Sequence, residues 1–84
     1  MTPDQIRSIL GENVKNRRLA MEMTLQELGD LVGVSNPRIW QIEHGRGAVP
    51  VDLLAKLADS LDTQPAVLLT ANAFAKKKSL AHSA

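Results

Sequence analysis

The sequence of 84 residues contains no cysteine and few aromatic side chains, with one tryptophan, one phenylalanine and no tyrosine. Without cysteine it can form neither a disulfide nor a thiolate zinc site, and this absence fits a protein of the reducing cytoplasm. No apolar run approaches the length needed to span a bilayer, and no secretory signal is visible at the N-terminus. We therefore expect a cytoplasmic protein without a membrane partner.

Strong charge and catalytic residue sets are missing too. The formal net charge is +1, so composition alone does not indicate a nucleic-acid partner. The sequence has no Ser/His/Asp set, no glycine-rich phosphate loop and no cluster of metal-ligating side chains, and His44 and His82 are isolated. We expect no enzymatic activity, no cofactor and no metal. What the sequence does have is 44% hydrophobic residues, almost all aliphatic, which suits one small helical domain.

Helix start signals divide the chain into five predicted helices. Thr2 with Pro3 and Gln5 begins the first, which should end near Ala20, although Gly11 leaves open that the helix proper begins only near Leu10. A fourth helix is predicted at 51–60, and Pro65 begins a fifth with an apolar side at 67–69. The spacing of apolar residues along the first helix and after it predicts several core side chains. Two basic side chains of that helix are expected to be solvated. The expected core residues include Ile6, Ile9, Leu10, Val14, Leu19, Met21 and Met23, and the solvated cations are Lys15 and Arg17.

The most informative stretch is 24–45, which predicts two short helices joined by a tight turn. Thr24 and Glu27 form a capping box, and Leu25, Leu28, Leu31 and Val32 follow at helical spacing. Gly33 stands where the first helix must stop, because glycine enters the left-handed region without steric cost. The next helix then runs from its expected N-cap Ser35, with Pro37 in the first turn, to a stop at Gly45.

A helical wheel separates two sides of this second helix. Ser35, Ile39 and Ile42 fall on one side, with Glu43 at its edge. The opposite side carries polar and aromatic residues, a composition that favours a contact surface over a merely solvated one. A lone tryptophan is usually a core residue, but here the two isoleucines already occupy the inward side. The outward residues are Asn36, Pro37, Arg38, Trp40 and Gln41.

These residues resemble the helix-turn-helix of the phage-repressor (Cro/repressor, or XRE) family of DNA-binding regulators. The similarity extends over roughly 10–69, and two departures from the family pattern are Leu25, where a phosphate-binding glutamine is usual, and Pro37, where a base-reading polar residue is common. By this resemblance Arg18 and Glu43 form a structural ion pair. The resemblance implies an all-α, five-helix, lambda-repressor-like domain with the helix-turn-helix at its second and third helices. The matching residues in the motif are Thr24, Glu27, Leu28, Gly33, Val34, Ser35, Ile39, Ile42, Glu43 and Gly45.

The expected partner is double-stranded DNA, with the second helix of the motif in the major groove. Asn36 and Gln41 can pair with adenine, Arg38 can reach guanine or phosphate, and Pro37 and Trp40 offer apolar contact, so these five are the predicted base-reading residues. Arg46 lies between two glycines, where the backbone can approach a phosphate closely. The full set of predicted phosphate contacts is Thr24, Gln26, Ser35, His44 and Arg46; for His44 the alternative is a solvated helix end.

The resemblance also implies a homodimer joined through the fifth helix and its extension, with Leu68, Leu69 and Phe74 at the interface. We expect one domain at 1–75 and a basic tail at 76–84, where three lysines are either a solvated helix end or a non-specific nucleic-acid contact. The predicted function is a homodimeric repressor that binds a palindromic operator, as in regulators of phage, plasmid or bacterial operons. The alternative is an antitoxin that binds a toxin and regulates its own operon through the same motif.

Overall fold

The computed structural model describes residues 1–74, which form five helices and no strand. The helices are α1 (Pro3–Ala20), α2 (Leu25–Val32), α3 (Asn36–Glu43), α4 (Val51–Ser60) and α5 (Pro65–Leu68). The predicted all-α class with five helices is therefore confirmed, while the predicted tail at 76–84 lies outside the described residues. None of the helices in residues 1–74 is both long and apolar enough to cross a membrane.

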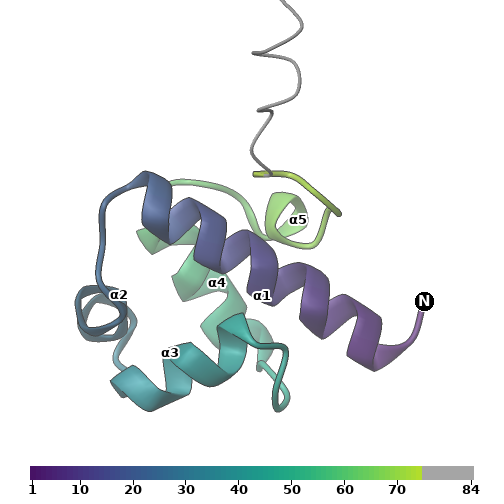
Figure 1. The fold of residues 1–84 in the computed structure, drawn as a ribbon, viewed down its shortest axis with the longest axis horizontal. Coiled ribbons are helices and arrows are strands. Elements are labelled where there is room, and N and C mark those ends of the chain that lie inside the picture. Colours follow the sequence, from purple (N-terminus) through teal and green to yellow (C-terminus); the bar gives the residue numbers. More distant parts are fainter. Residues whose placement is uncertain (75–84) are drawn as a thin grey trace, which may run out of the picture.

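The long helix α1 organises the arrangement of the others. It packs against α3 on one side and α5 on the other, while α2 contacts both α3 and α4 (Figure 1). Helix α1 is continuous from Pro3, so the alternative that it begins only near Leu10 is wrong. The capping box of Thr2 and Gln5 closes its first turn and explains why the helix begins so early.

The predicted caps of the central motif form in the structure. The Thr24 hydroxyl accepts the Glu27 N–H at 3.0 Å, and the Glu27 carboxylate accepts the Thr24 N–H at 2.8 Å. Gly33 ends α2 in the left-handed region with φ of 79°. The Ser35 hydroxyl then accepts the Arg38 N–H at 3.3 Å and begins α3. Local sequence chemistry thus sets both ends of the turn.

The core is aliphatic and draws on every helix. Ile39 and Ile42 are wholly or almost wholly buried, as the helical wheel predicted for the inward side of α3, whereas Ser35 is exposed. Burying such side chains removes apolar surface from water, at about 1.5–3 kcal/mol for each large residue. The buried hydrophobic residues are Leu10, Val14, Leu28, Val32, Ile39, Ile42, Leu53, Leu57, Ala58, Leu61 and Leu68.

Three residues expected in apolar positions are exposed instead. Leu31 is 62% exposed, Leu19 is 50% exposed and Met21 is 37% exposed, whereas Met23 does pack against the core. Leu19 lies in the last turn of α1 and Met21 directly follows this helix, where Arg17 and Arg18 make the contacts with the other elements. Leu31 is on the outer side of α2. Helical spacing predicted that these residues belong to the apolar faces of their helices, but the buried part of each face is smaller than the spacing suggests.

Two polar side chains of α1 join it to the segment around α5. The buried Asn13 donates from Nδ2 to the carbonyls of Leu68 at 2.7 Å and Thr70 at 2.8 Å. Arg17 donates from Nε to the Leu61 carbonyl at 2.8 Å, and its guanidinium lies 5.4 Å from the centre of the Phe74 ring. The expectation that Arg17 is solvated is therefore wrong, because its charge serves the carbonyl end of α4.

Candidate nucleic-acid interface

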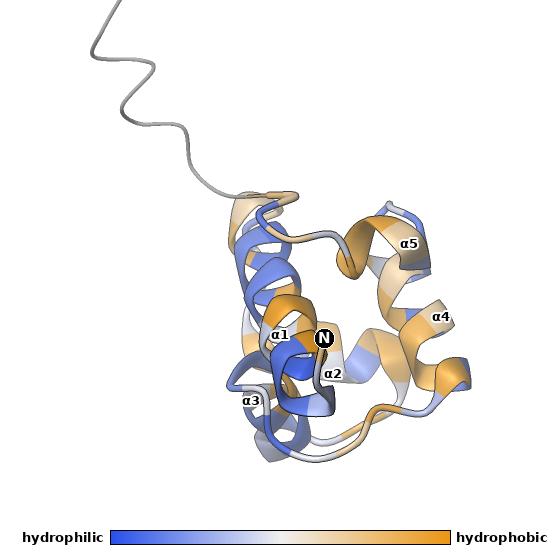
Figure 2. Cartoon of the chain, turned by 90° about the vertical axis from the view of Figure 1, so that its right-hand side faces the viewer, coloured by the Kyte–Doolittle hydropathy of each residue, from blue (hydrophilic) through white to orange (hydrophobic). Residues whose placement is uncertain are grey.

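The outward side of α3 carries polar and aromatic side chains. Figure 2 shows α3 mainly in the colour of hydrophilic residues, whereas α4 and α5 are mainly hydrophobic. Pro37, Trp40 and Gln41 are exposed, and the Trp40 side chain keeps 40% of its surface in solvent. Asn36 and Arg38 are half-buried at the edges of this surface. The structure thus brings the five predicted base-reading residues onto one helix surface.

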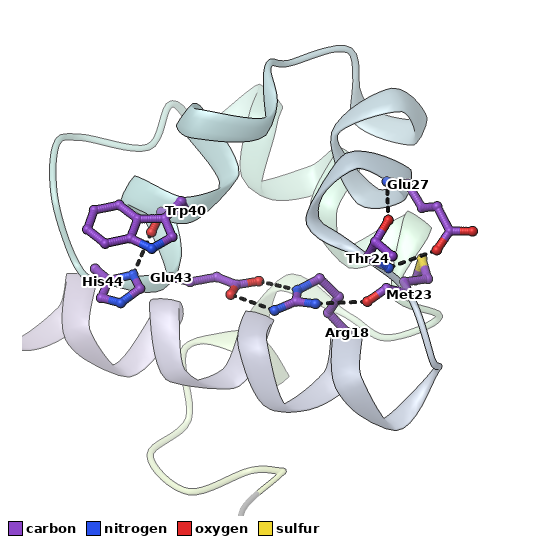
Figure 3. A network of polar contacts seen from close by, with 7 residues as sticks. All are labelled: Arg18, Met23, Thr24, Glu27, Trp40, Glu43 and His44. Carbon is purple, nitrogen blue, oxygen red and sulfur yellow. Dashed lines mark hydrogen bonds and ion pairs between the residues drawn. The ribbon is translucent and has the colours of Figure 1, made fainter.

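The orientation of α3 is fixed by a buried ion pair (Figure 3). The Arg18 guanidinium donates to the two carboxylate oxygens of Glu43 at 2.6 Å and 3.0 Å, and a third N–H donates to the Met23 carbonyl at 2.8 Å. The structure therefore brings Arg18 and Glu43 together. This bidentate geometry is directional, so it fixes the rotation of α3 about its axis as isoleucine contacts alone would not.

Close helix packing also sets the depth of α3. A Cβ on Gly11 of α1 would lie 2.4 Å from the Ile42 carbonyl oxygen and 2.7 Å from that of Glu43. A Cβ on Gly29 of α2 would lie 2.7 Å from the Val34 carbonyl oxygen. All three distances are shorter than contact allows, so these two glycines permit the close approach of the backbone around α3. Gly11 is therefore a packing residue and not a weak point of α1.

Two basic side chains, His44 and Arg46, lie against the Trp40 indole. The His44 ring stacks on the indole with centroids 3.9 Å apart, and the Arg46 guanidinium lies 5.3 Å from the indole centre. His44 Nδ1 is 2.8 Å from the Trp40 carbonyl oxygen, which can only accept, so Nδ1 carries the proton (Figure 3). His44 is thus stacked and hydrogen-bonded, and Arg46 remains exposed beside it.

Arg38 makes a contact that the sequence does not reveal. Its Nη2 donates to the Ala48 carbonyl at 2.6 Å, which joins the first turn of α3 to the loop before α4. In the same loop Gly47 has φ of 78°, and a Cβ there would lie 3.3 Å from Arg38 Nη1. No local pattern links positions 38 and 48, and only the folded loop brings them together.

The predicted phosphate contacts at the other end of the motif lie around two helix N-termini. Thr24 and Gln26 are exposed at the start of α2, where Gln26 Nε2 donates to Asp30 at 2.8 Å. Ser35 is exposed at the start of α3, with its hydroxyl already accepting the Arg38 N–H. In the first turns the Glu27 and Arg38 N–H groups are already bonded to the capping hydroxyls, and Pro37 has no N–H, so an anion there would be left with the N–H groups of Leu25, Gln26 and Asn36.

The predicted dimer residues differ in accessibility. Leu68 has no exposed surface, so it cannot contact a second copy and its predicted place in the dimer interface is wrong. It fills the core below α1, where Asn13 binds its carbonyl. Leu69 and Phe74 are half-buried and pack partly against the core. Only part of the predicted interface is open to a second copy.

Together, a capped helix pair with a left-handed glycine turn, a fixed second helix and an outward polar face define a helix-turn-helix DNA-binding domain. Residues 14–68 match the helix-turn-helix family model HTH_3, of the XRE type, and the chain belongs to this family. It is a DNA-binding transcriptional regulator by family. No curated protein sequence matches this chain.

Solved structures show the same fold. The regulator of the clp gene, ClgR, from Corynebacterium glutamicum has 28% identity and a TM-score of 0.75, over 93% of this chain and 81% of that one. The restriction-modification controller protein C.AhdI from Aeromonas hydrophila has 26% identity and a TM-score of 0.70, over 74% of this chain and 94% of that one. An HTH_3 family transcriptional regulator from Vibrio cholerae has 27% identity and a TM-score of 0.73, over 98% of this chain but 43% of that one.

Proposed function

We propose that the protein is a homodimeric repressor that binds a palindromic operator with α3 of each copy in the major groove. The observation that carries this proposal is the fixed, outward face of α3, where Pro37, Trp40 and Gln41 are exposed above the buried Ile39 and Ile42. Base pairs present distinct patterns of donors and acceptors in the major groove, which a single exposed helix face can reach. Such a regulator acts at the nucleoid of a bacterium or an infected cell.

In this proposal the side chains have separate tasks. Asn36 and Gln41 hydrogen-bond to base edges, and Pro37 and Trp40 supply apolar contact with thymine methyl groups or the groove wall. Arg46, next to the indole, binds a phosphate where α3 ends. His44 can add a hydrogen bond from Nε2 only as the imidazolium, because Nδ1 holds the one proton of the neutral ring. The exposed N-terminal turns with Thr24, Gln26 and Ser35 bind further phosphates.

The dimer surface that we propose lies at the end of α1. Leu19, which is half exposed, lines a hollow of about 180 Å³ together with Asn16, Ala20 and Phe74. None of these four described lining residues is acidic, so carboxylates of the lining do not oppose the approach of two copies. One helix-turn-helix makes few base contacts, and two copies related by a two-fold axis read two half-sites about one helical turn apart.

The test uses the intrinsic fluorescence of Trp40, the single tryptophan. Duplex DNA from upstream of the gene is titrated at several salt concentrations beside a scrambled duplex. Gln41→Ala should cost about 1–3 kcal/mol at one base position and relax sequence preference there. Arg46→Ala should weaken binding about equally on all sequences and reduce the slope of log K against log salt by about one.

The two variants control for each other, because one alters sequence preference and the other alters salt dependence. Unchanged affinity in both would show that the recognition surface is elsewhere. No preference for the upstream duplex at any salt concentration would favour the alternative of a partner-binding protein such as an antitoxin, which a pull-down from the host would then address.

A further inference from the structure

We propose that Arg38 is a positioning residue, which holds the loop at 45–49 and with it the phosphate-binding Arg46, and that it does not read bases. This inference rests on the proposed function, in which Arg46 binds DNA. Its structural basis is the hydrogen bond from Arg38 Nη2 to the Ala48 carbonyl at 2.6 Å, which links two segments ten residues apart.

The loop backbone is shaped around the Arg38 guanidinium. Gly47 lies in the left-handed region with φ of 78°, a conformation that glycine adopts without strain. A Cβ at that position would lie 3.3 Å from Nη1, so the backbone passes directly beside the guanidinium. The side chain is therefore bonded to the loop at Ala48 through Nη2, and Nη1 lies where a side chain at position 47 would begin.

Electrostatics explains why this arginine uses a carbonyl of its own chain. Arg38 lies in the first turn of α3, at the positive end of the helix dipole, and no acidic residue lies in that turn. A cation there is unfavourable for the helix by itself. A carbonyl oxygen that accepts from the guanidinium offsets this cost, and a charge-assisted hydrogen bond is stronger than a neutral one.

The same loop carries Arg46, two residues before Ala48. At the start of the loop, the Arg46 N–H donates to the Gln41 carbonyl at 2.9 Å. Nearer its end, Arg38 donates to the Ala48 carbonyl. Trp40 orients the Arg46 guanidinium from the helix. Arg38 thus anchors the later part of the loop that presents Arg46 to a phosphate.

The bond to Ala48 limits base reading through direction. Each terminal nitrogen of a guanidinium carries two N–H groups, so the Ala48 carbonyl occupies only one donor of Nη2. The bond nevertheless turns the guanidinium toward the loop, and an end-on contact with guanine needs both terminal nitrogens to face a base edge. To turn the guanidinium toward a base, Arg38 would have to give up this orientation, and the geometry of the free protein favours the loop.

The first measurement is amide hydrogen exchange in the free protein, followed by NMR at the Arg46 N–H. In Arg38→Ala this amide should exchange about tenfold faster, because the loop opens more readily, while the amide of the buried Val14 should be unchanged. Lys56→Ala is the matched control, since it also removes one positive charge, from the exposed side of α4. It should leave the Arg46 amide unaffected. Equal exchange in Arg38→Ala and the unmodified protein would overturn the proposal.

The second measurement is a double-mutant cycle on a short duplex of mixed sequence at low salt, read by anisotropy of labelled DNA. Arg38→Ala and Arg46→Ala should each weaken binding by about tenfold, and the double variant should be little weaker than either, because Arg38 acts through Arg46. Additive losses, or an altered base preference in Arg38→Ala, would instead identify a direct DNA contact. Absence of duplex binding by the unmodified chain would contradict the proposed function, and the exchange rates would still decide whether Arg38 holds the loop.

Discussion

The Arg18 and Glu43 side chains lie between α1 and α3 with 9% and 2% of their surface exposed. Removing two charges from water is costly, so such a pair is weak evidence for net stability. Its value here is geometric, because two parallel hydrogen bonds and a third to the Met23 carbonyl define one orientation of α3. The pair thus orients Trp40 and Gln41 outward while being buried itself.

Glu43→Gln tests this residue pair with little change in volume. It should lower the free energy of unfolding by about 3 kcal/mol, because the Arg18 charge is left buried without its counter-charge. Urea denaturation measures the loss, and Glu12→Gln, at an exposed position of α1, should change stability by less than about 0.5 kcal/mol. Replacing both partners with methionine should cost less than the sum of the single replacements. A Glu43→Gln protein as stable as the control would contradict the prediction.

Helix crossings depend on residues that spacing patterns do not identify. By intrinsic propensity, alanine is better than glycine inside α1 by up to about 1 kcal/mol. In the folded protein, however, the Cβ of an alanine at position 11 would meet the backbone carbonyls of Ile42 and Glu43, which cannot move as a side chain end can. The crossing contact therefore outweighs the propensity.

Gly11→Ala should consequently destabilise the protein, by about 1–3 kcal/mol, as overpacking does. Thermal unfolding followed by circular dichroism measures the change, and DNA affinity should fall as well because α3 is displaced. Glu12→Ala is the control, one residue away on the exposed side, where the propensity gain alone applies. If Gly11→Ala raised the unfolding temperature as much as the control does, the close contact of α1 with α3 would be wrong.

The sequence predicts the elements well because their signals are local. Thr24 with Glu27, Gly33 and Ser35 act within one turn of where they stand, and the bounds of α1 and α4 agree with the prediction. Asn13 and Arg38 could not be assigned in this way, since their partners are 55 and ten residues away and are backbone carbonyls without a sequence signature. The extent of the apolar face was also overestimated at Leu19 and Leu31, because spacing does not show where the neighbouring helices end.

At the scale of the whole molecule, the exposed leucines Leu19 and Leu31 line two different hollows. One, of about 460 Å³, contains Leu31 and Met23 with the carboxylates of Glu27 and Asp30. Two copies of this surface would bring four negative charges together. The smaller hollow at Leu19 and Phe74 lacks such charges and is therefore the better site for a second copy.

Leu19→Asp should separate the proposed dimer while leaving each copy folded. A carboxylate at the centre of an apolar contact is desolvated without a partner, so the dimer dissociation constant should rise by roughly thirtyfold, the effect of a central interface residue. Sedimentation velocity measures the dissociation, and unchanged circular dichroism would show an intact fold, since Leu19 is half exposed. Leu31→Asp is the control, because it places the same charge on an even more exposed leucine of α2. If the dimer survived Leu19→Asp but dissociated with Leu31→Asp, the interface would lie on α2 instead. If the unmodified protein were a monomer at all concentrations, the model of two copies binding about a two-fold axis would be wrong.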